Sequence, residues 1–282
     1  MHLGRDRVIC AYDVEGVIVD PGPASSVAAL DGLEPRALLL THIHLDHAGA
    51  TGVLVREHPD LKVYVHERGA PHLVDPSRLL ASAEKLYGED MDRLWGEVAP
   101  VPEENIHALR GGETVEGFRV AYTPGHASHH VCYLHEPTGD AYVGDVCGVR
   151  VPPYDFTMAP TPPPDIDLEQ WQASVRIVED WRPSAVCLTH FGRKTDVQEQ
   201  LERIRERLAT WGELARGGDG ERFVAAVRDQ VRAATDPEAA KRLLQAAPAD
   251  QLWLGLERYW RKRAEAEAES EGAGAEEPAG AR

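Results

Sequence analysis

Cysteine is scarce in this chain of 282 residues. The four cysteines, Cys10, Cys132, Cys147 and Cys187, are widely spaced, and no Cys-x-x-Cys pair suggests a redox site or a zinc ribbon. Each lies in or beside an apolar segment, so we expect buried free thiols of the kind found in a reducing cytoplasm.

Long hydrophobic runs are also missing. No run approaches the length of a membrane span, and residues 1–7 lack the apolar core of a signal peptide. The hydrophobic content of 43% is ordinary for a soluble globular protein. We therefore expect a cytoplasmic protein with no membrane partner, large enough for one large domain or two small ones.

Positive charge is in deficit. The chain has 30 Lys and Arg against 47 Asp and Glu, which gives a formal net charge of −17, and no basic cluster stands out. Proteins that follow a phosphate backbone gather Lys and Arg on one face, so this balance argues against nucleic acid as a partner. Lysine occurs only five times, and Asn105 is the sole asparagine, a bias that either a GC-rich genome or a hot habitat would produce.

The most informative segment present is Thr41-His42-Ile43-His44-Leu45-Asp46-His47. It follows the apolar run Ala37–Leu40, as expected for a buried strand that delivers metal ligands to the loop at its end. Alternate side chains of an extended segment point the same way, so His42 and His44 can bind one ion. Asp46 and His47 lie where the chain turns toward a helix and can face a second ion.

Three further candidate ligands each follow an apolar segment: His126, Asp145 and His190. With the first cluster they make five imidazoles and two carboxylates, which predicts a metal-binding protein.

This pattern resembles the signature of the metallo-β-lactamase superfamily, which is His-x-His-x-Asp-His followed by a distant His, Asp and His. The resemblance covers about the first 195 residues, and all seven ligand positions of the dinuclear hydrolase branch, which includes glyoxalase II and lactonases, are filled. It implies that His42, His44 and His126 hold a first metal and that Asp46, His47 and His190 hold a second. It also implies that Asp145 bridges the two and that Asp20 hydrogen-bonds near the ligand loop, although Asp20-Pro21-Gly22 also suits a simple turn.

The ligand types limit the cofactor and the chemistry. Nitrogen and carboxylate ligands suit two divalent ions, with zinc preferred here and iron or manganese left open. Two such ions would share a bridging hydroxide as the nucleophile. Asp46 is the natural carrier of a proton to the leaving group. No Gly-x-Ser-x-Gly nucleophile motif occurs. His129 and His130 either touch substrate, orient a ligand or simply start a half-buried strand.

The resulting prediction is a metal-dependent hydrolase that acts on a small ester, lactone or thioester. One alternative is a phosphodiesterase on the same two metals, which a basic pocket near Arg150 and Arg193 would favour. Another is a persulfide dioxygenase, which resembles glyoxalase II but uses a single iron.

Residues 150–164 connect two of the candidate ligands and contain six prolines, which would stiffen a wall above the metals. Within this loop Tyr154 could donate a hydrogen bond to substrate, and Phe156 and Met158 could line an apolar pocket. A rigid connector without substrate contact is the alternative.

The pattern of apolar segments predicts an α+β fold, an αββα sandwich of two sheets with helices outside. We expect a catalytic domain over residues 1–195 and a helical extension over 196–263 that either packs near the mouth of the site or stabilises the sandwich or a homodimer. From Ala264 to the end, Ala, Glu and Gly without an apolar face predict a disordered tail.

Overall fold

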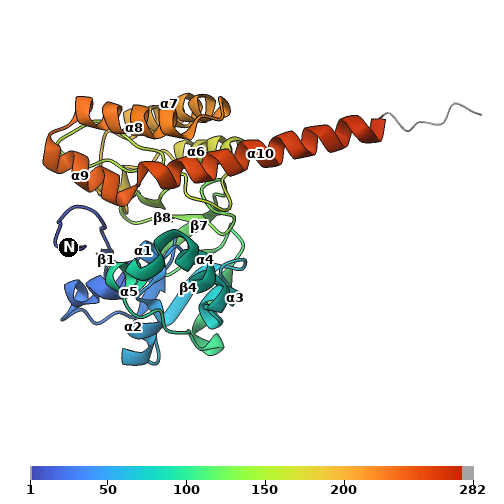
Figure 1. The fold of residues 1–282 in the computed structure, drawn as a ribbon. Helices are drawn as coiled ribbons and strands as arrows, with labels where there is room; N and C mark the ends of the chain where they lie inside the picture. Colours follow the sequence, from blue (N-terminus) through green and yellow to red (C-terminus); the bar gives the residue numbers. More distant parts are fainter. Residues whose placement is uncertain (1, 275–282) are drawn as a thin grey trace, which may run out of the picture.

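The computed structural model describes residues 2–274 and contains two β-sheets that pack face to face (Figure 1). The first sheet has the order β1-β2-β3-β4-β5, in which β1 is antiparallel to β2 and all other neighbours are parallel. Its strands are β1 (Tyr12–Val14), β2 (Val17–Val19), β3 (Ala37–Leu39), β4 (Lys62–His66) and β5 (Ile106–Leu109).

The second sheet has the order β11-β10-β9-β8-β7-β6, and only β9 and β10 form a parallel pair. Its strands are β6 (Thr114–Val115), β7 (Phe118–Tyr122), β8 (Val131–His135), β9 (Asp140–Gly144), β10 (Ala185–Leu188) and β11 (Gly192–Lys194). The sequence predicts one strand over residues 113–122, but a turn at Glu116 and Gly117, both with positive φ, divides it into β6 and β7. The sequence pattern does not predict strand β11.

The position of strand β3 between two apolar cores explains why its sequence is apolar throughout. Ala37 and Leu39 point into the core between the sheets, whereas Leu38 and Leu40 point into the core beneath the helices of the first sheet. Because successive side chains of a strand face opposite ways, a strand covered on both faces needs a continuous apolar run.

Short helices cover the outer face of the first sheet (Figure 1). They are η1 (Ala24–Leu30, 3₁₀), α1 (Leu45–Ala48), α2 (Thr51–Glu57), α3 (Ala70–Val74), α4 (Ser77–Tyr87), η2 (Gly88–Asp90, 3₁₀), α5 (Met91–Trp95) and η3 (Glu103–Asn105, 3₁₀).

The helices from α6 onward cover the outer face of the second sheet (Figure 1). They are α6 (Leu168–Asp180), α7 (Val197–Arg216), α8 (Gly220–Ala234), α9 (Pro237–Ala246) and α10 (Ala249–Gly274). Apolar side chains of α7 to α10, among them Leu201, Trp211, Phe223 and Leu256, share one core with Leu134 and Val143 of that sheet. The helical extension therefore stabilises the sandwich, and the predicted αββα architecture with C-terminal helices is confirmed.

The end of the described chain differs from the sequence-based expectation. Helix α10 continues through Gly274 and projects beyond the body of the molecule, so the prediction of disorder from Ala264 is wrong for residues 264–274 (Figure 1). Ala and Glu are strong helix formers, and pairs such as Arg261–Glu265 and Arg263–Glu267 support the helix at a spacing of four residues. The predicted tail over 275–282 lies outside the described residues.

The cysteines are free: Cys132, Cys147 and Cys187 are buried, as predicted, and Cys10 is half-buried. Burial raises the pKa of the Cys132 thiol to about 12, so it is inert as a nucleophile. Within residues 2–274, no helix combines the length and the apolar character needed to cross a membrane.

Candidate metal centre

The seven predicted ligands lie together at one edge of the sandwich. β2 and β3 are parallel, and β7, β9 and β10 run in a common direction in the other sheet, so the segments that follow these strands meet at the same edge. The ligands fall into three converging groups, which are His42, His44, His126; His42, His47, Asp145; and Asp46, His47, His190. The predicted sets are thus brought together, and a shared group joins them.

Two glycines allow the backbone to present ligands here. Gly125, before His126, has φ of +128°, and a Cβ atom on it would lie 2.3 Å from the backbone nitrogen of Trp171. Gly144, before Asp145, has φ of +48°, and a Cβ atom would lie 2.5 Å from Oγ1 of Thr41. Both positions require the absence of a side chain.

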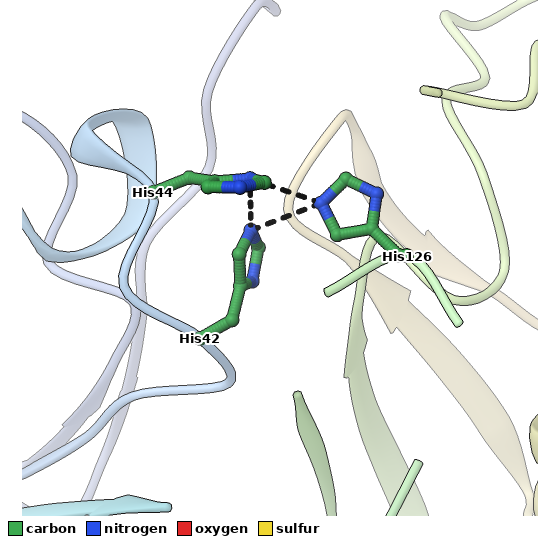
Figure 2. Close-up of side chains that lie close together, drawn as sticks. All are labelled: His42, His44 and His126. Carbon is green, nitrogen blue, oxygen red and sulfur yellow. Dashed lines mark hydrogen bonds between the residues drawn. The ribbon is translucent and has the colours of Figure 1, made fainter. Parts of the chain in front are cut away.

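In the first group, three ring nitrogens converge, two from the loop between β3 and α1 and one from the loop after β7 (Figure 2). Nδ1 of His44 lies 3.0 Å from Nε2 of His42 and 3.0 Å from Nε2 of His126, and the two Nε2 atoms are 3.3 Å apart. Nitrogens bound to one zinc at roughly 2.0–2.1 Å in tetrahedral geometry would be separated by about 3.3 Å. The spacing fits a single ion.

Hydrogen bonds to the other ring nitrogens determine which ones carry protons. Nδ1 of His126 faces the Pro160 carbonyl at 2.8 Å, an acceptor only, so Nδ1 must donate. The Thr41 hydroxyl donates to Oδ2 of Asp20 at 2.7 Å and can only accept from Nδ1 of His42 at 3.1 Å. The Nε2 atoms of His42 and His126 therefore both present lone pairs and cannot hydrogen-bond to each other, whereas a cation satisfies both.

The group formed by Asp46, His47 and His190, called the second group from here on, has the same arrangement. His47 donates from Nδ1 to Oδ2 of Asp20 at 2.7 Å, and His190 donates from Nδ1 to the Val8 carbonyl at 2.6 Å. Their Nε2 atoms, together with Oδ1 of Asp145, are buried without a hydrogen-bond partner among residues 2–274. Such atoms are rare in proteins, and a metal ion held by this group would satisfy all three.

Asp145 lies between the two groups and presents one oxygen to each. Its Oδ2 is 3.3 Å from Nε2 of His126 in the first group. Its Oδ1 is 3.4 Å from Nε2 of His47 and 3.6 Å from Nε2 of His190 in the second. Nε2 of His190 is also 3.2 Å from Oδ2 of Asp46, which completes that group.

The electrostatics of the two groups differ. Burial lowers the pKa of His44 to about 4 and keeps it neutral, as a metal ligand requires. Burial also opposes protonation of His47 and His190, but the nearby carboxylates, Asp145 above all, outweigh it and raise both pKa values. The carboxylates therefore favour positive charge beside His47 and His190, and bound divalent ions would supply that charge.

Asp20 and His130 support the ligands from behind. Asp20 is fully buried and accepts from the Thr41 backbone, the Thr41 and Thr189 hydroxyls and His47, so it joins the segment of residues 41–47 to the segment that carries His190. The interpretation of Asp20 as a simple turn residue is wrong. His130 accepts at Nε2 from the backbone nitrogen of Asp145, which shows that it orients a ligand.

A pocket of about 330 Å³ opens at the metal centre, and His44, Asp46 and Asp145 form part of its lining. Its largely apolar walls come from α4, from the proline-rich loop at Pro160 and Pro162–Pro164, and from the junction of α9 and α10 at Ala246–Pro248. The C-terminal helical extension therefore also packs near the mouth of the site, which is one of the two roles predicted for it from the sequence.

The three predicted pocket residues are wrong. Tyr154 donates to Asp236, the N-cap residue of α9, at 2.7 Å, the Arg207 guanidinium lies 4.5 Å from the Phe156 ring centroid, and Met158 is fully buried in the helix-covered core. None of them lines the pocket at the metals. The first half of the loop packs against α7 and α9, and only its second half returns to the site.

Sequence reasoning missed Tyr87 of α4 and Gln251 of α10, whose side chains meet at 3.4 Å beside Asp46. Both follow helical patterns that carry no local signal of a site.

Comparison with known proteins agrees with this geometry. The model of the metallo-beta-lactamase superfamily matches residues 9–190. The chain belongs to this superfamily. The prediction made from the motif is confirmed, and membership indicates a metallohydrolase.

Individual relatives cover parts of the chain. A metallo-beta-lactamase fold-containing protein of Sulfurisphaera tokodaii is 28% identical over 184 residues, which are 62% of this chain and 68% of that protein. The hydroxyacylglutathione hydrolase of Salmonella paratyphi A is 32% identical over 142 residues, 47% of this chain and 44% of its own length. This chain thus matches less than half of that hydrolase.

Solved structures show the same fold. The crystal structure of the archaeal superfamily protein from Sulfolobus tokodaii gives a TM-score of 0.61 at 25% identity and covers 71% of this chain and 80% of that one. A second relative, solved in a di-iron-bound form, gives a TM-score of 0.51 at 28% identity and covers 74% of this chain and 98% of that one.

Proposed function

We propose that this chain hydrolyses a small ester, lactone or thioester at a centre of two divalent ions. The observation that carries the proposal is that Asp145 lies between two groups of three candidate ligands, presents one oxygen to each, and borders a largely apolar pocket. His42, His44 and His126 would hold one ion, and Asp46, His47 and His190 the other. Zinc is the preferred ion because the ligands are nitrogen and carboxylate, while the di-iron form of a relative supports iron as the alternative.

Bound metal would supply Lewis-acid polarisation of the substrate and activation of water. The residues around it perform the other tasks. The pocket walls exclude bulk water from the reacting group, which strengthens the electrostatic interactions there. Asp46 borders the pocket with a side chain that is 20% exposed, so its carboxylate can pass a proton to a leaving group there.

Neither the phosphodiesterase nor the mononuclear-iron persulfide dioxygenase, the two alternative functions, has specific support in the site. Arg150 is bound by Asp155, Asp196 and Gln200, and Arg193 is bound by Asp140, so neither can form a basic pocket for a phosphodiester. A mononuclear iron site would use only the first ligand group, which leaves no role for the buried Nε2 atoms of His47 and His190.

Removal of metal tests the proposal. Exhaustive chelation should abolish hydrolysis of 4-nitrophenyl esters, lactones and thioesters, and Zn²⁺, Fe²⁺ or Mn²⁺ added back singly should restore it. We expect at least one of these substrate classes to be turned over by the metal-loaded protein and a phosphodiester such as bis(4-nitrophenyl) phosphate to be a poor substrate. Preferred turnover of the phosphodiester, or oxygen consumption with a persulfide in place of hydrolysis, would replace the proposal with one of the alternatives.

A further inference from the structure

The part of the pocket lining contributed by the turn between β4 and α3, by α3, by the start of α4 and by the His126–His130 loop includes basic side chains. It presents Arg68, His72, Arg78 and His129 to the pocket. Another part of the lining comes from Pro160, Pro162–Pro164, Asp165 and the α9–α10 junction, and it is mainly apolar. A substrate that fills the pocket would therefore meet nitrogen donors along one edge and apolar carbon along the other.

The two arginines have no carboxylate partner, although the chain carries a net charge of −17. Neighbouring arginines are paired: Arg56 with Glu97, Arg93 with Asp90, and Arg110 with Glu67, which is the acid adjacent to Arg68 in sequence. Among residues 2–274, Arg68 and Arg78 form no ion pair, and the only aromatic contact of Arg68 is with Tyr122, 5.9 Å from the ring centroid. Two exposed guanidinium groups without an ion pair among the described residues thus line the pocket, and we call this part of its lining the rim.

The acids near this rim are already engaged. Asp165, which follows the proline-rich segment, accepts from the Ser128 hydroxyl at 2.6 Å. Asp75 accepts from the Ser77 backbone at 3.1 Å, and its pKa is lowered first by Ser77 and to a smaller extent by Arg78. An external anion can therefore bind to Arg68 and Arg78 without displacing an internal ion pair.

His129 continues the donor edge toward the metal centre. Its ring centroid is 5.9 Å from that of His44, and its Nδ1 accepts from the Ile43 backbone at 3.5 Å. In the neutral ring Nε2 then carries the proton and is a donor. His129, His72 and the arginines thus provide donors from the metals to the rim.

We propose that Arg68 and Arg78 bind a carboxylate at the far end of the substrate, so that the natural substrate is an ester, lactone or thioester with an apolar body and a terminal carboxylate. A planar carboxylate matches the fork of N–H donors of a guanidinium group, and the donor edge leading to this rim suits oxygen acceptors along the body. The proposal rests on the proposed function, because it assigns the reacting carbonyl to the metal centre.

Binding of simple acids tests the proposal without requiring turnover. Straight-chain α,ω-dicarboxylates of five to ten carbons are titrated calorimetrically into the metal-loaded protein, each beside the monocarboxylate of equal length. At one chain length we expect the dicarboxylate to bind about tenfold more tightly, the gain of one charge-assisted contact to guanidinium. That gain should disappear in the double variant Arg68→Gln/Arg78→Gln and persist in Arg222→Gln, which changes an exposed arginine of α8 outside the pocket.

Hydrolysis of 4-nitrophenyl pentanoate separates this proposal from the proposed function. This neutral ester has no carboxylate for Arg68 and Arg78, so the wild type and Arg222→Gln, which changes no residue of the pocket lining, should both cleave it in a metal-dependent reaction and at the same rate. Equal binding of mono- and dicarboxylates at every length, or a gain that survives in the double variant, would overturn the carboxylate site while leaving the hydrolase intact. Absence of metal-dependent hydrolysis together with a length-dependent gain would instead contradict the proposed function alone.

Discussion

Replacing Asp145 by alanine should abolish most of the activity and weaken metal binding at both groups. Each carboxylate oxygen faces a different group, so both lose a ligand at once. Loss of several kcal/mol of metal-dependent stabilisation corresponds to a decrease in turnover of roughly 10³-fold or more. Steady-state kinetics and metal content of the same preparation measure the two effects together.

A matched control separates loss of metal from loss of fold. Asp165→Asn changes another carboxylate of the pocket lining that contacts Ser128 and none of the candidate ligands, so it should retain metal. Circular dichroism should show the same secondary structure for both variants. Near-normal turnover and full metal content in Asp145→Ala would show that the bridging role is misassigned.

Asp46→Asn should reveal a second role for that residue. Should Asp46 act only as a ligand, excess metal would restore metal content and activity together. We expect activity to remain low at full metal occupancy, because Asp46 borders the pocket and a general acid contributes about 10²–10⁴-fold. The loss should be largest for esters with poor leaving groups, since good leaving groups need little protonation.

Rates measured on esters with good and poor leaving groups also identify the alternative proton donor. Tyr154 is excluded because its hydroxyl is bound to Asp236 outside the pocket, whereas His129 borders the pocket beside His44. A fully metallated Asp46→Asn protein with unchanged rates on poor leaving groups would refute the dual role. The same series measured on His129→Gln would then show whether His129 supplies the proton.

The candidate metal centre is largely encoded in local sequence. Each ligand follows a short apolar run, and such runs become strands whose ends meet at one edge of the sandwich. His42, His44, Asp46 and His47 occur within six residues, so their spacing alone predicts shared ions. The support by Asp20 could not be decided from sequence, because the Asp-Pro-Gly turn and the hydrogen bonds to His47 and Thr189 require the same residue.

The pocket could not be predicted in the same way. Its walls come from α4 and from the α9–α10 junction, which are more than 150 residues apart and meet only through tertiary packing. Composition pointed to Phe156 and Met158, but apolar side chains serve a core as well as a pocket, and here they pack under Arg207 and in the helix-covered core. Likewise, nothing in the sequence distinguishes Arg68 and Arg78 from ordinary surface residues, and only the folded chain shows that they line the pocket.

The number of metal ions per chain tests the two-metal centre most directly. Protein stripped of metal, reloaded with excess zinc or iron and freed of loose ions should retain about two ions per chain by elemental analysis, because both ligand groups are complete. One tightly held ion, with full activity at that stoichiometry, would contradict the shared role of Asp145 and favour a mononuclear site at His42, His44 and His126.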